Sequence, residues 1–139
     1  MKENVFSYTQ ALLLAHTMAP LVIDVQGHSM WPTLRSADQI MIEATPSYRV
    51  GDILLFHDGK QLVVHRLVRT TQVGGNIYFQ TKGDNRRSFD AAIGETDILG
   101  RVSAILRGNR TLPIRQPRLR YILPYAWVLS ATRRRIWRD

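Results

Sequence analysis

The chain has 139 residues, enough for one compact domain with its own hydrophobic core and too few for two domains of ordinary size. Hydrophobic residues make up 45% of the sequence and the mean hydropathy is -0.17, which is typical of a globular protein. The sequence contains no cysteine, so disulfides, thiolate metal sites and a cysteine nucleophile are excluded.

The formal net charge of +8 is concentrated in one segment. Residues 1–106 contain ten Lys and Arg and ten Asp and Glu, whereas residues 107–139 contain nine Arg and a single acidic residue, Asp139. Such a basic segment indicates either contact with a polyanion, phospholipid or nucleic acid, or a solvated tail. Because residues 1–106 are electrically balanced and carry no base-reading motif that we recognise, we do not expect nucleic acid as a partner.

The first predicted element is a short N-terminal helix within residues 1–20, where apolar residues recur with few turn formers before Pro20. A β domain is predicted for residues 21–116, and a basic, aromatic tail for residues 117–139. Residues 83–95 are polar and lack periodicity, so we expect them to form a functional loop rather than a strand. Alternation and bounding turn residues predict strands at Leu21–Val25, Gln39–Glu43, Ile53–Phe56, Gln61–Arg69, Asn76–Thr81 and Ile98–Arg107, with a hairpin turn at Gly74-Gly75.

The tail of residues 117–139 mixes aromatic, aliphatic and Arg residues with helix-like spacing, and Pro124 kinks it or divides it into two helices. Two interpretations stay open: an interfacial helix that binds anionic lipid, or a helix that packs on the β domain. The apolar stretches Ala11–Val25 and Leu119–Thr132 fall short of the ~20 residues that cross a bilayer. We therefore expect a cytoplasmic protein, or one peripheral on the cytoplasmic membrane, rather than an N-terminally anchored one.

Four side chains supply the parts of a nucleophile, base and orienter set: Ser29, His65, Asp84 and Asp90. A serine hydroxyl is a poor nucleophile until a base takes its proton, and a neutral imidazole, with a reference pKa of about 6.5, suits that task. An aspartate that accepts the other imidazole N–H would fix the tautomer that faces the serine. Either aspartate can fill this role, because both lie in the predicted loop of residues 83–95.

Each of these residues also has a purely structural interpretation. Ser29 can belong to an ordinary turn, and His65 can be a packed residue of its apolar strand. Asp84 can form a local turn with its own backbone, and Asp90 can be a solvated loop charge. His28 is an alternative base, but neighbouring residues on an extended chain point to opposite sides. It is the combination of the four residues that favours catalysis.

Five motifs follow one another within residues 24–102: Gly27-x-Ser29-Met30-x-Pro32-Thr33-Leu34, Gly51-Asp52-Ile53 with Phe56, Val64-His65-Arg66, Lys82-Gly83-Asp84-Asn85 with Asp90, and Leu99-Gly100-Arg101-Val102. In this order they resemble the signal peptidase I superfamily. More narrowly, they resemble its Ser-His branch of the endoplasmic-reticulum and archaeal type, in a short form without a clear transmembrane anchor.

This resemblance implies a mainly β, antiparallel domain and peptide-bond hydrolysis through an acyl-enzyme on Ser29. It assigns His65 as general base and then acid, and it matches Asp90 to the aspartate usually placed in the site, with Asp84 as the close second. Met30 and Pro32 are expected to contact the substrate. Many signal peptidases carry Ser-Gly ahead of the nucleophile, where this chain has Gly27-His28. The oxyanion must therefore be stabilised by backbone N–H groups, including that of Ser29.

The leading functional hypothesis is a serine endopeptidase that removes a signal or leader segment from a protein or peptide precursor. The second is a self-cleaving regulatory peptidase of the repressor type, a class that uses lysine as its base and carries an internal cleavage site. The third is a non-catalytic binding module on the same fold. No cofactor or metal is expected, because His16, His28, His57 and His65 lack a recognisable ligand spacing.

Overall fold

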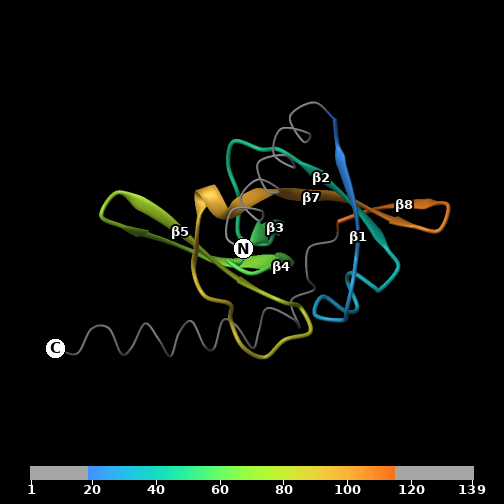
Figure 1. Ribbon diagram of the computed structural model, residues 1–139, viewed down its shortest axis with the longest axis horizontal. Helices are drawn as coiled ribbons and strands as arrows, with labels where there is room; N and C mark the ends of the chain where they lie inside the picture. Colours follow the sequence, from blue (N-terminus) through green and yellow to red (C-terminus); the bar gives the residue numbers. More distant parts are fainter. Residues whose placement is uncertain (1–18, 115–139) are drawn as a thin grey trace.

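Short apolar runs, each bounded by turn residues, form the strands of this protein in the computed structural model (Figure 1). The structure describes residues 19–114, and within them the regular elements are eight strands and one 3-10 helix, η1 (Glu95–Asp97). The strands are β1 (Leu21–Asp24), β2 (Gln39–Glu43), β3 (Ile53–His57), β4 (Leu62–Val73), β5 (Asn76–Lys82), β6 (Ile93–Gly94), β7 (Ile98–Arg107) and β8 (Arg110–Pro113).

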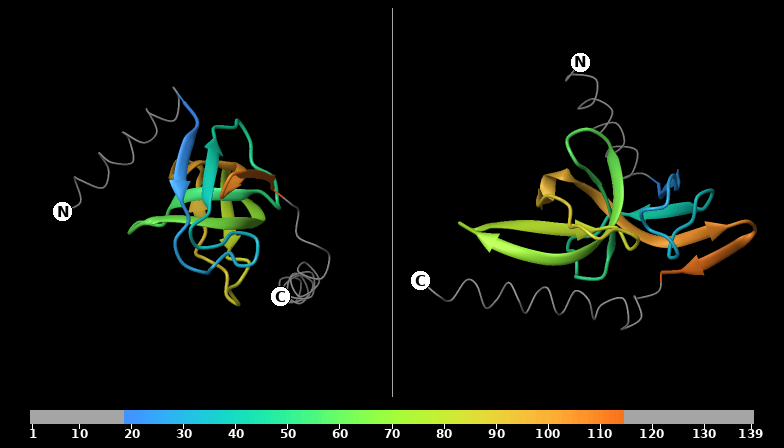
Figure 2. Two further views of the ribbon diagram at one scale, coloured as in Figure 1. Left: turned by 90° about the vertical axis from the view of Figure 1, so that its right-hand side faces the viewer. Right: turned by 90° about the horizontal axis from the view of Figure 1, so that it is seen from below.

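The strands form one antiparallel sheet in the order β1-β2-β7-β3-β4-β5-β6, with β8 paired to β7 away from this path. The sheet is strongly twisted, so the β4–β5 hairpin and the β7–β8 hairpin extend from opposite sides of the body (Figures 1 and 2). A mainly β, antiparallel fold was the prediction, and it is confirmed. The predicted helix of residues 1–20, apart from its last two residues, and the predicted tail of residues 117–139 lie outside the described residues.

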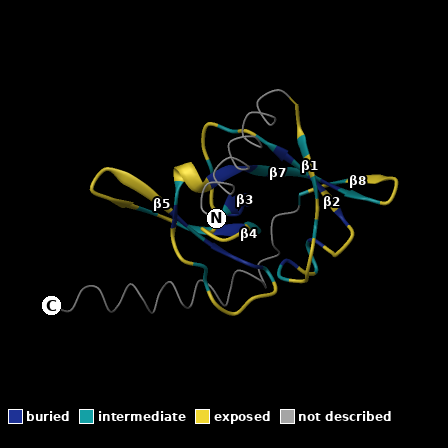
Figure 3. Ribbon diagram, viewed as in Figure 1, coloured by how far each residue is buried: buried dark blue, intermediate teal, exposed yellow. Residues whose placement is uncertain are grey.

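Strand β3 explains why the sheet has a core on both faces. Its residues Ile53, Leu54, Leu55 and Phe56 are all buried, and successive side chains of a strand point to opposite faces. Ile53 and Leu55 belong to one buried cluster, and Leu54 and Phe56 belong to a second. The two clusters form the buried centre that Figure 3 shows in dark blue, with exposed residues toward the hairpin tips. A continuous apolar run is what a strand covered on both faces requires.

The turn between β4 and β5 is set by two glycines. Gly74 and Gly75 have φ angles of 58° and 82°, and a two-residue hairpin turn with both φ values positive matches the right-handed twist of its strands. The pairing runs from Val73–Asn76 at the tip to Arg66–Lys82 at the base. The hairpin predicted around this turn is therefore present, and β4 continues four residues beyond the predicted end at Arg69.

Two strands were not predicted. Strand β6 lies inside residues 83–95, which we expected to contain no strand, and it pairs Ile93 and Gly94 with β5. Two residues are too few to show an alternation of apolar and polar side chains. They form a strand because they pair with the edge of β5. Strand β8 pairs with β7 through a turn at Gly108 (φ 58°). Most of β8 is exposed and polar, so its sequence resembles a loop.

Candidate active site

Ser29 lies in a turn that the chain enters directly after edge strand β1. Gly27 precedes it with φ 76°, a left-handed conformation that favours glycine. The turn is fixed from behind by Met30 and Leu34, whose side chains are buried in the core, and the Leu34 N–H donates to the Met30 carbonyl at 3.0 Å. This anchoring leaves the Ser29 side chain partly exposed beside a cleft.

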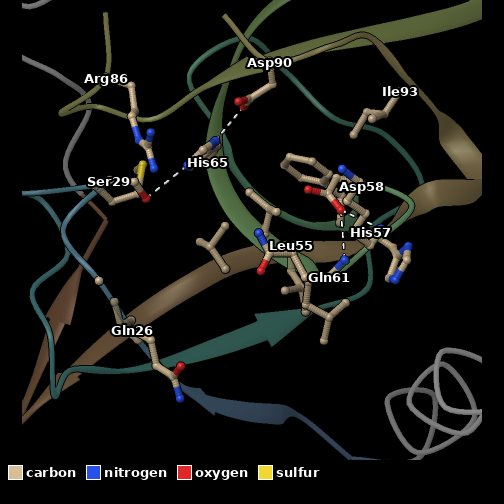
Figure 4. A pocket seen from close by; sticks show the side chains of 18 of the residues that line it. Gln26, Ser29, Leu55, His57, Asp58, Gln61, His65, Arg86, Asp90 and Ile93 are labelled. Carbon is tan, nitrogen blue, oxygen red and sulfur yellow. Dashed lines mark hydrogen bonds and ion pairs between the residues drawn. The ribbon is translucent and has the colours of Figure 1, made fainter. Parts of the chain in front are cut away.

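His65 reaches Ser29 from β4. The residue is 7% exposed, and its imidazole stands edge-on to the Phe56 ring, with 6.4 Å between the ring centroids. Nε2 of His65 lies 3.0 Å from Oγ of Ser29, while Nδ1 lies 2.5 Å from Oδ2 of Asp90 (Figure 4). Both ring nitrogens are thus occupied, one by the hydroxyl and one by a carboxylate. An Nδ1–H that donates to Asp90 leaves the lone pair of Nε2 to accept the serine proton.

Asp90 is held in place by β5. Its N–H donates to the Thr81 carbonyl at 2.9 Å, and the Thr81 hydroxyl donates to Asp90 Oδ2 at 2.7 Å. Burial alone would raise the pKa of this carboxyl group. The hydrogen bonds from His65 and Thr81, together with electrostatic interactions with His65 and Arg86, outweigh burial and hold the pKa below its ordinary value of 3.8. Asp90 is therefore an anion wherever the site would work near neutral pH.

Asp84 has a different position. Arg66 donates to both of its carboxylate oxygens at 2.8 Å, and the Thr33 hydroxyl donates to Oδ2 at 2.6 Å. Alternation along β4 directs Arg66 away from the face that carries His65, so this ion pair lies behind the site. Arg66 and Asp84 are only 5% and 15% exposed, and Arg66 also donates to the Gly51 carbonyl at 2.7 Å. Asp84 thus ties together three loops instead of touching the imidazole.

The loop that follows β5 also binds the backbone of the turn that carries Ser29. The Asn85 N–H donates to the Ser29 carbonyl at 2.8 Å, and the Asn85 side chain donates to the His28 carbonyl at 3.0 Å. Gly83 passes so close that a Cβ there would lie 2.6 Å from the Ser29 carbonyl oxygen and 3.1 Å from His65 Nε2. Only glycine fits at this point without a shift of the backbone.

Sequence reasoning did not assign a supporting role in the site to four residues: Gly83, Asn85, Thr81 and Arg66. Gly83 and Asn85 do lie inside the Lys-Gly-Asp-Asn motif. For Arg66 and Thr81, the alternation of side chains along a strand was the signal that could have indicated their positions. It places Arg66 on the face opposite His65, and it separates Thr81 from its neighbour Lys82. Lys82 is buried and donates from Nζ to the Gly83 carbonyl at 3.1 Å.

The remaining predicted residues have less direct positions. His28 is exposed, and in residues 19–114 its hydrogen bonds are made by its carbonyl oxygen, so its ring has no bond to Ser29. Met30 borders the cleft but is buried in the core, where its sulfur accepts the Asp84 N–H at 3.3 Å. Pro32 is not among the residues that line the cleft. Substrate contact by Met30 and Pro32 stays a prediction.

The cleft beside Ser29 has a volume of about 930 Å³. It is lined by residues 23–30, which include the end of β1, a strand unpaired on its outer side within residues 19–114, and by residues 55–65 of β3, the β3–β4 turn and β4. Leu55, Leu62 and Val64 give its middle an apolar surface, as Figure 4 shows in part around Leu55. A cleft lined by the end of an edge strand and by an apolar surface fits an extended peptide.

Residues 19–114 hold neither a candidate metal cluster nor a candidate membrane span. In this range, no group of three or more His, Cys, Asp or Glu side chains could hold a metal ion. Across the same residues, no helix has the length and apolar character needed to cross a membrane.

Comparison with known proteins gives two matches. A model of the Peptidase S24-like family matches residues 3–103, which is most of the chain, and the chain belongs to that family. Signal peptidase I W of Bacillus subtilis (strain 168) is 32% identical over 72 residues. The match covers 49% of this chain and 38% of that relative, so the chain spans well under half of the relative's length. Together the two matches support membership of the superfamily that contains S24-like and signal peptidases.

Proposed function

We propose that this protein is a serine endopeptidase of the Ser-His-Asp type that cleaves a signal or leader segment from a protein or peptide precursor. The observation that carries the proposal is the continuous chain of contacts from Ser29 Oγ through His65 to Asp90, at 3.0 Å and 2.5 Å. In this arrangement Ser29 is the nucleophile, His65 the general base and acid, and Asp90 the group that orients the imidazole.

The proposed reaction begins when Nε2 of His65 takes the Ser29 proton and Oγ attacks the scissile carbonyl carbon. The resulting imidazolium is stabilised by the Asp90 carboxylate. His65 then gives the proton to the leaving amine, which departs and leaves an acyl-enzyme on Ser29. Water then attacks the ester carbon while His65 takes its proton. The bond between Oγ and the acyl carbon breaks, the acyl product leaves as a carboxylic acid, and His65 returns the proton to Ser29 Oγ.

The negative charge that develops on the carbonyl oxygen needs hydrogen-bond donors. The Ser29 N–H donates to no acceptor among residues 19–114, so it is available for this purpose. No serine hydroxyl stands two residues ahead of Ser29, because Gly27 occupies that position. We therefore assign the oxyanion to backbone donors of the turn, which are rigid because the core and Asn85 hold the turn from both sides.

The cleft supports a peptide substrate in an extended conformation. Within residues 19–114, the outer edge of β1 is unpaired, so a peptide could add there as a strand, and the apolar surface at Leu55, Leu62 and Val64 suits uncharged side chains on the acyl side. A signal or leader segment satisfies both conditions. The name of the Bacillus subtilis relative, a signal peptidase I, is compatible with this choice of substrate.

Cleavage of a peptide library by the purified chain tests the proposal. Wild-type protein should cleave a restricted set of sequences, and both Ser29→Ala and His65→Ala should reduce cleavage to background while their folds, checked by circular dichroism, stay intact. Cleavage that survives Ser29→Ala would reject the mechanism.

The same samples separate the two alternative functions. A self-cleaving regulator would show a Ser29-dependent loss of intact mass in its own chain without processing added peptides. A non-catalytic binding module would do neither. The endopeptidase should process peptides in trans with multiple turnovers while its own mass stays constant.

We further propose that residues 117–139 dock the enzyme on anionic lipid, since this segment combines Arg with aromatic residues. Flotation with vesicles that contain phosphatidylserine should recover the full chain and much less of a chain that ends at residue 116. Equal recovery of both would reject a membrane role for this segment.

A further inference from the structure

Arg86 is the one arginine that lines the cleft, within the residues that the structure describes. Its N–H donates to the Gly83 carbonyl at 3.0 Å, which closes the turn after β5. From this turn the side chain extends toward Ser29 in Figure 4, on the side of the nucleophile away from Gln26 and Leu55. The guanidinium has no hydrogen-bond or ion-pair partner in residues 19–114, so its five N–H donors are unpaired within this part of the chain.

Distances around Gly83 locate this side chain relative to the reacting atoms. The point where a Gly83 Cβ would stand is 2.7 Å from Arg86 Cγ and 3.1 Å from His65 Nε2. Cγ of Arg86 therefore lies no more than about 6 Å from Nε2, the sum of those two distances. The guanidinium extends beyond Cγ and can reach groups bound next to Nε2.

The chemistry of the reaction decides which part of a substrate lies there. His65 Nε2 must protonate the leaving amine, so the residue that follows the cleaved bond must be bound beside Nε2. We place the acyl side of the substrate in the part of the cleft that extends from Ser29 past Leu55, away from Arg86. Carboxylates at Asp24, Asp58 and Asp97 line other parts of that cleft, where an acidic substrate side chain would be repelled.

We propose that Arg86 is a specificity residue that binds a carboxylate on the leaving side of the substrate, so that the enzyme prefers Asp or Glu directly after the cleaved bond. This inference rests on the proposed peptidase function. A bound substrate would shield the guanidinium from water and strengthen a two-pronged Arg–carboxylate contact beyond that of an exposed pair. We expect a preference of about fivefold to tenfold for Asp over its near-isostere Asn.

The test uses three peptides built on the best-cleaved library sequence, with Asp, Asn or Lys directly after the scissile bond. Wild-type protein should rank them Asp, Asn, Lys in kcat/KM. Arg86→Gln should bring the Asp/Asn ratio to about one, and Arg86→Glu should favour Lys. Arg87→Gln is the matched control, because Arg87 is the exposed neighbouring arginine and does not line the cleft. It should keep the wild-type ratio.

A role in supporting Asp90 gives a different pattern. The charge of Arg86 also lowers the pKa of Asp90, and loss of that effect would slow all three peptides by the same factor. A wild-type Asp/Asn ratio near one, or a ratio that Arg86→Gln leaves unchanged, overturns the specificity proposal while Ser29-dependent cleavage upholds the peptidase function. Absence of any Ser29-dependent cleavage and of any Ser29 labelling by a phosphonate rejects the peptidase function and this inference with it.

Discussion

Replacing Asp90 with Asn should remove the charge that supports His65 while keeping nearly the same shape. The carboxylate accepts two hydrogen bonds through Oδ2, one from His65 at 2.5 Å and one from Thr81 at 2.7 Å. The amide that replaces the Asp90 carboxylate can accept from both His65 and Thr81 only if its oxygen takes the place of Oδ2. If its NH₂ group turns toward Nδ1, it stabilises the tautomer whose proton lies on Nε2, which can no longer accept the Ser29 proton.

The expected loss follows from the charge that forms on the imidazole during attack. Opposite charges about 4 Å apart, at an effective dielectric constant of about 20, interact by about 4 kcal/mol. The Asp90 side chain is 29% exposed, so solvent weakens this interaction, and we take about 3 kcal/mol as effective. At about 1.4 kcal/mol per decade, kcat should fall by about 10²-fold, and further toward 10⁴-fold if the wrong tautomer dominates.

The assay is steady-state cleavage of the best library peptide by Asp90→Asn, with Asp84→Asn as the control from the same loop. The control loses charge from the pair with Arg66, so it should be less stable but should keep kcat within about tenfold of wild type, measured below its melting temperature. A kcat for Asp90→Asn within tenfold of wild type would refute the reasoning. So would a larger loss of kcat in Asp84→Asn than in Asp90→Asn.

Three further predictions concern the support of the site. Gly83→Ala should abolish most activity with an altered Tm, because its Cβ would lie 2.6 Å from a backbone oxygen; wild-type kcat/KM in this variant would contradict the described packing. Arg66→Gln leaves the Asp84 carboxylate buried and uncompensated, and urea unfolding should show a loss of about 3–5 kcal/mol, whereas a loss below about 1 kcal/mol would show that the pair is dispensable. The hydrogen bond from Arg107 lowers the pKa of Asp38, so the folded protein binds that proton less tightly than the unfolded chain; its stabilising contribution is present above pH 3.8 and is lost as the pH falls through the folded-state pKa. Unfolding measured from about pH 6 to about pH 2.5 should therefore bring wild type and Asp38→Asn closer together at acidic pH, and a constant gap between them would count against this linkage.

Local sequence patterns were sufficient for the strands that carry the site. The apolar run of β3 and the glycine pair between β4 and β5 each have a direct structural consequence, a strand buried on both faces and a tight hairpin turn. Strand β6 and strand β8 were missed because they exist through pairing with a longer neighbour and not through a pattern of their own. Such strands depend on tertiary context.

The candidate site was predictable in its residue types but not in its connections. Asp84 and Asp90 lie six positions apart in one polar loop, and their positions in the loop do not distinguish them; the preference for Asp90 came from the family resemblance alone. The two aspartates take different positions because they bind different partners elsewhere in the chain. Asp84 pairs with Arg66, on the face of β4 opposite His65, and Thr81 holds Asp90 beside the imidazole. The crowding at Gly83 likewise depends on three segments that meet only in the folded protein.

The most direct test of the account is covalent labelling of Ser29 by a serine-reactive phosphonate, with the modified residue located by mass spectrometry of the digested protein. The account predicts a single label on Ser29, absent in Ser29→Ala and strongly slowed in His65→Ala. Labelling of Ser29 at the wild-type rate in His65→Ala would contradict it, because the imidazole 3.0 Å from Oγ would then have no part in activating the hydroxyl.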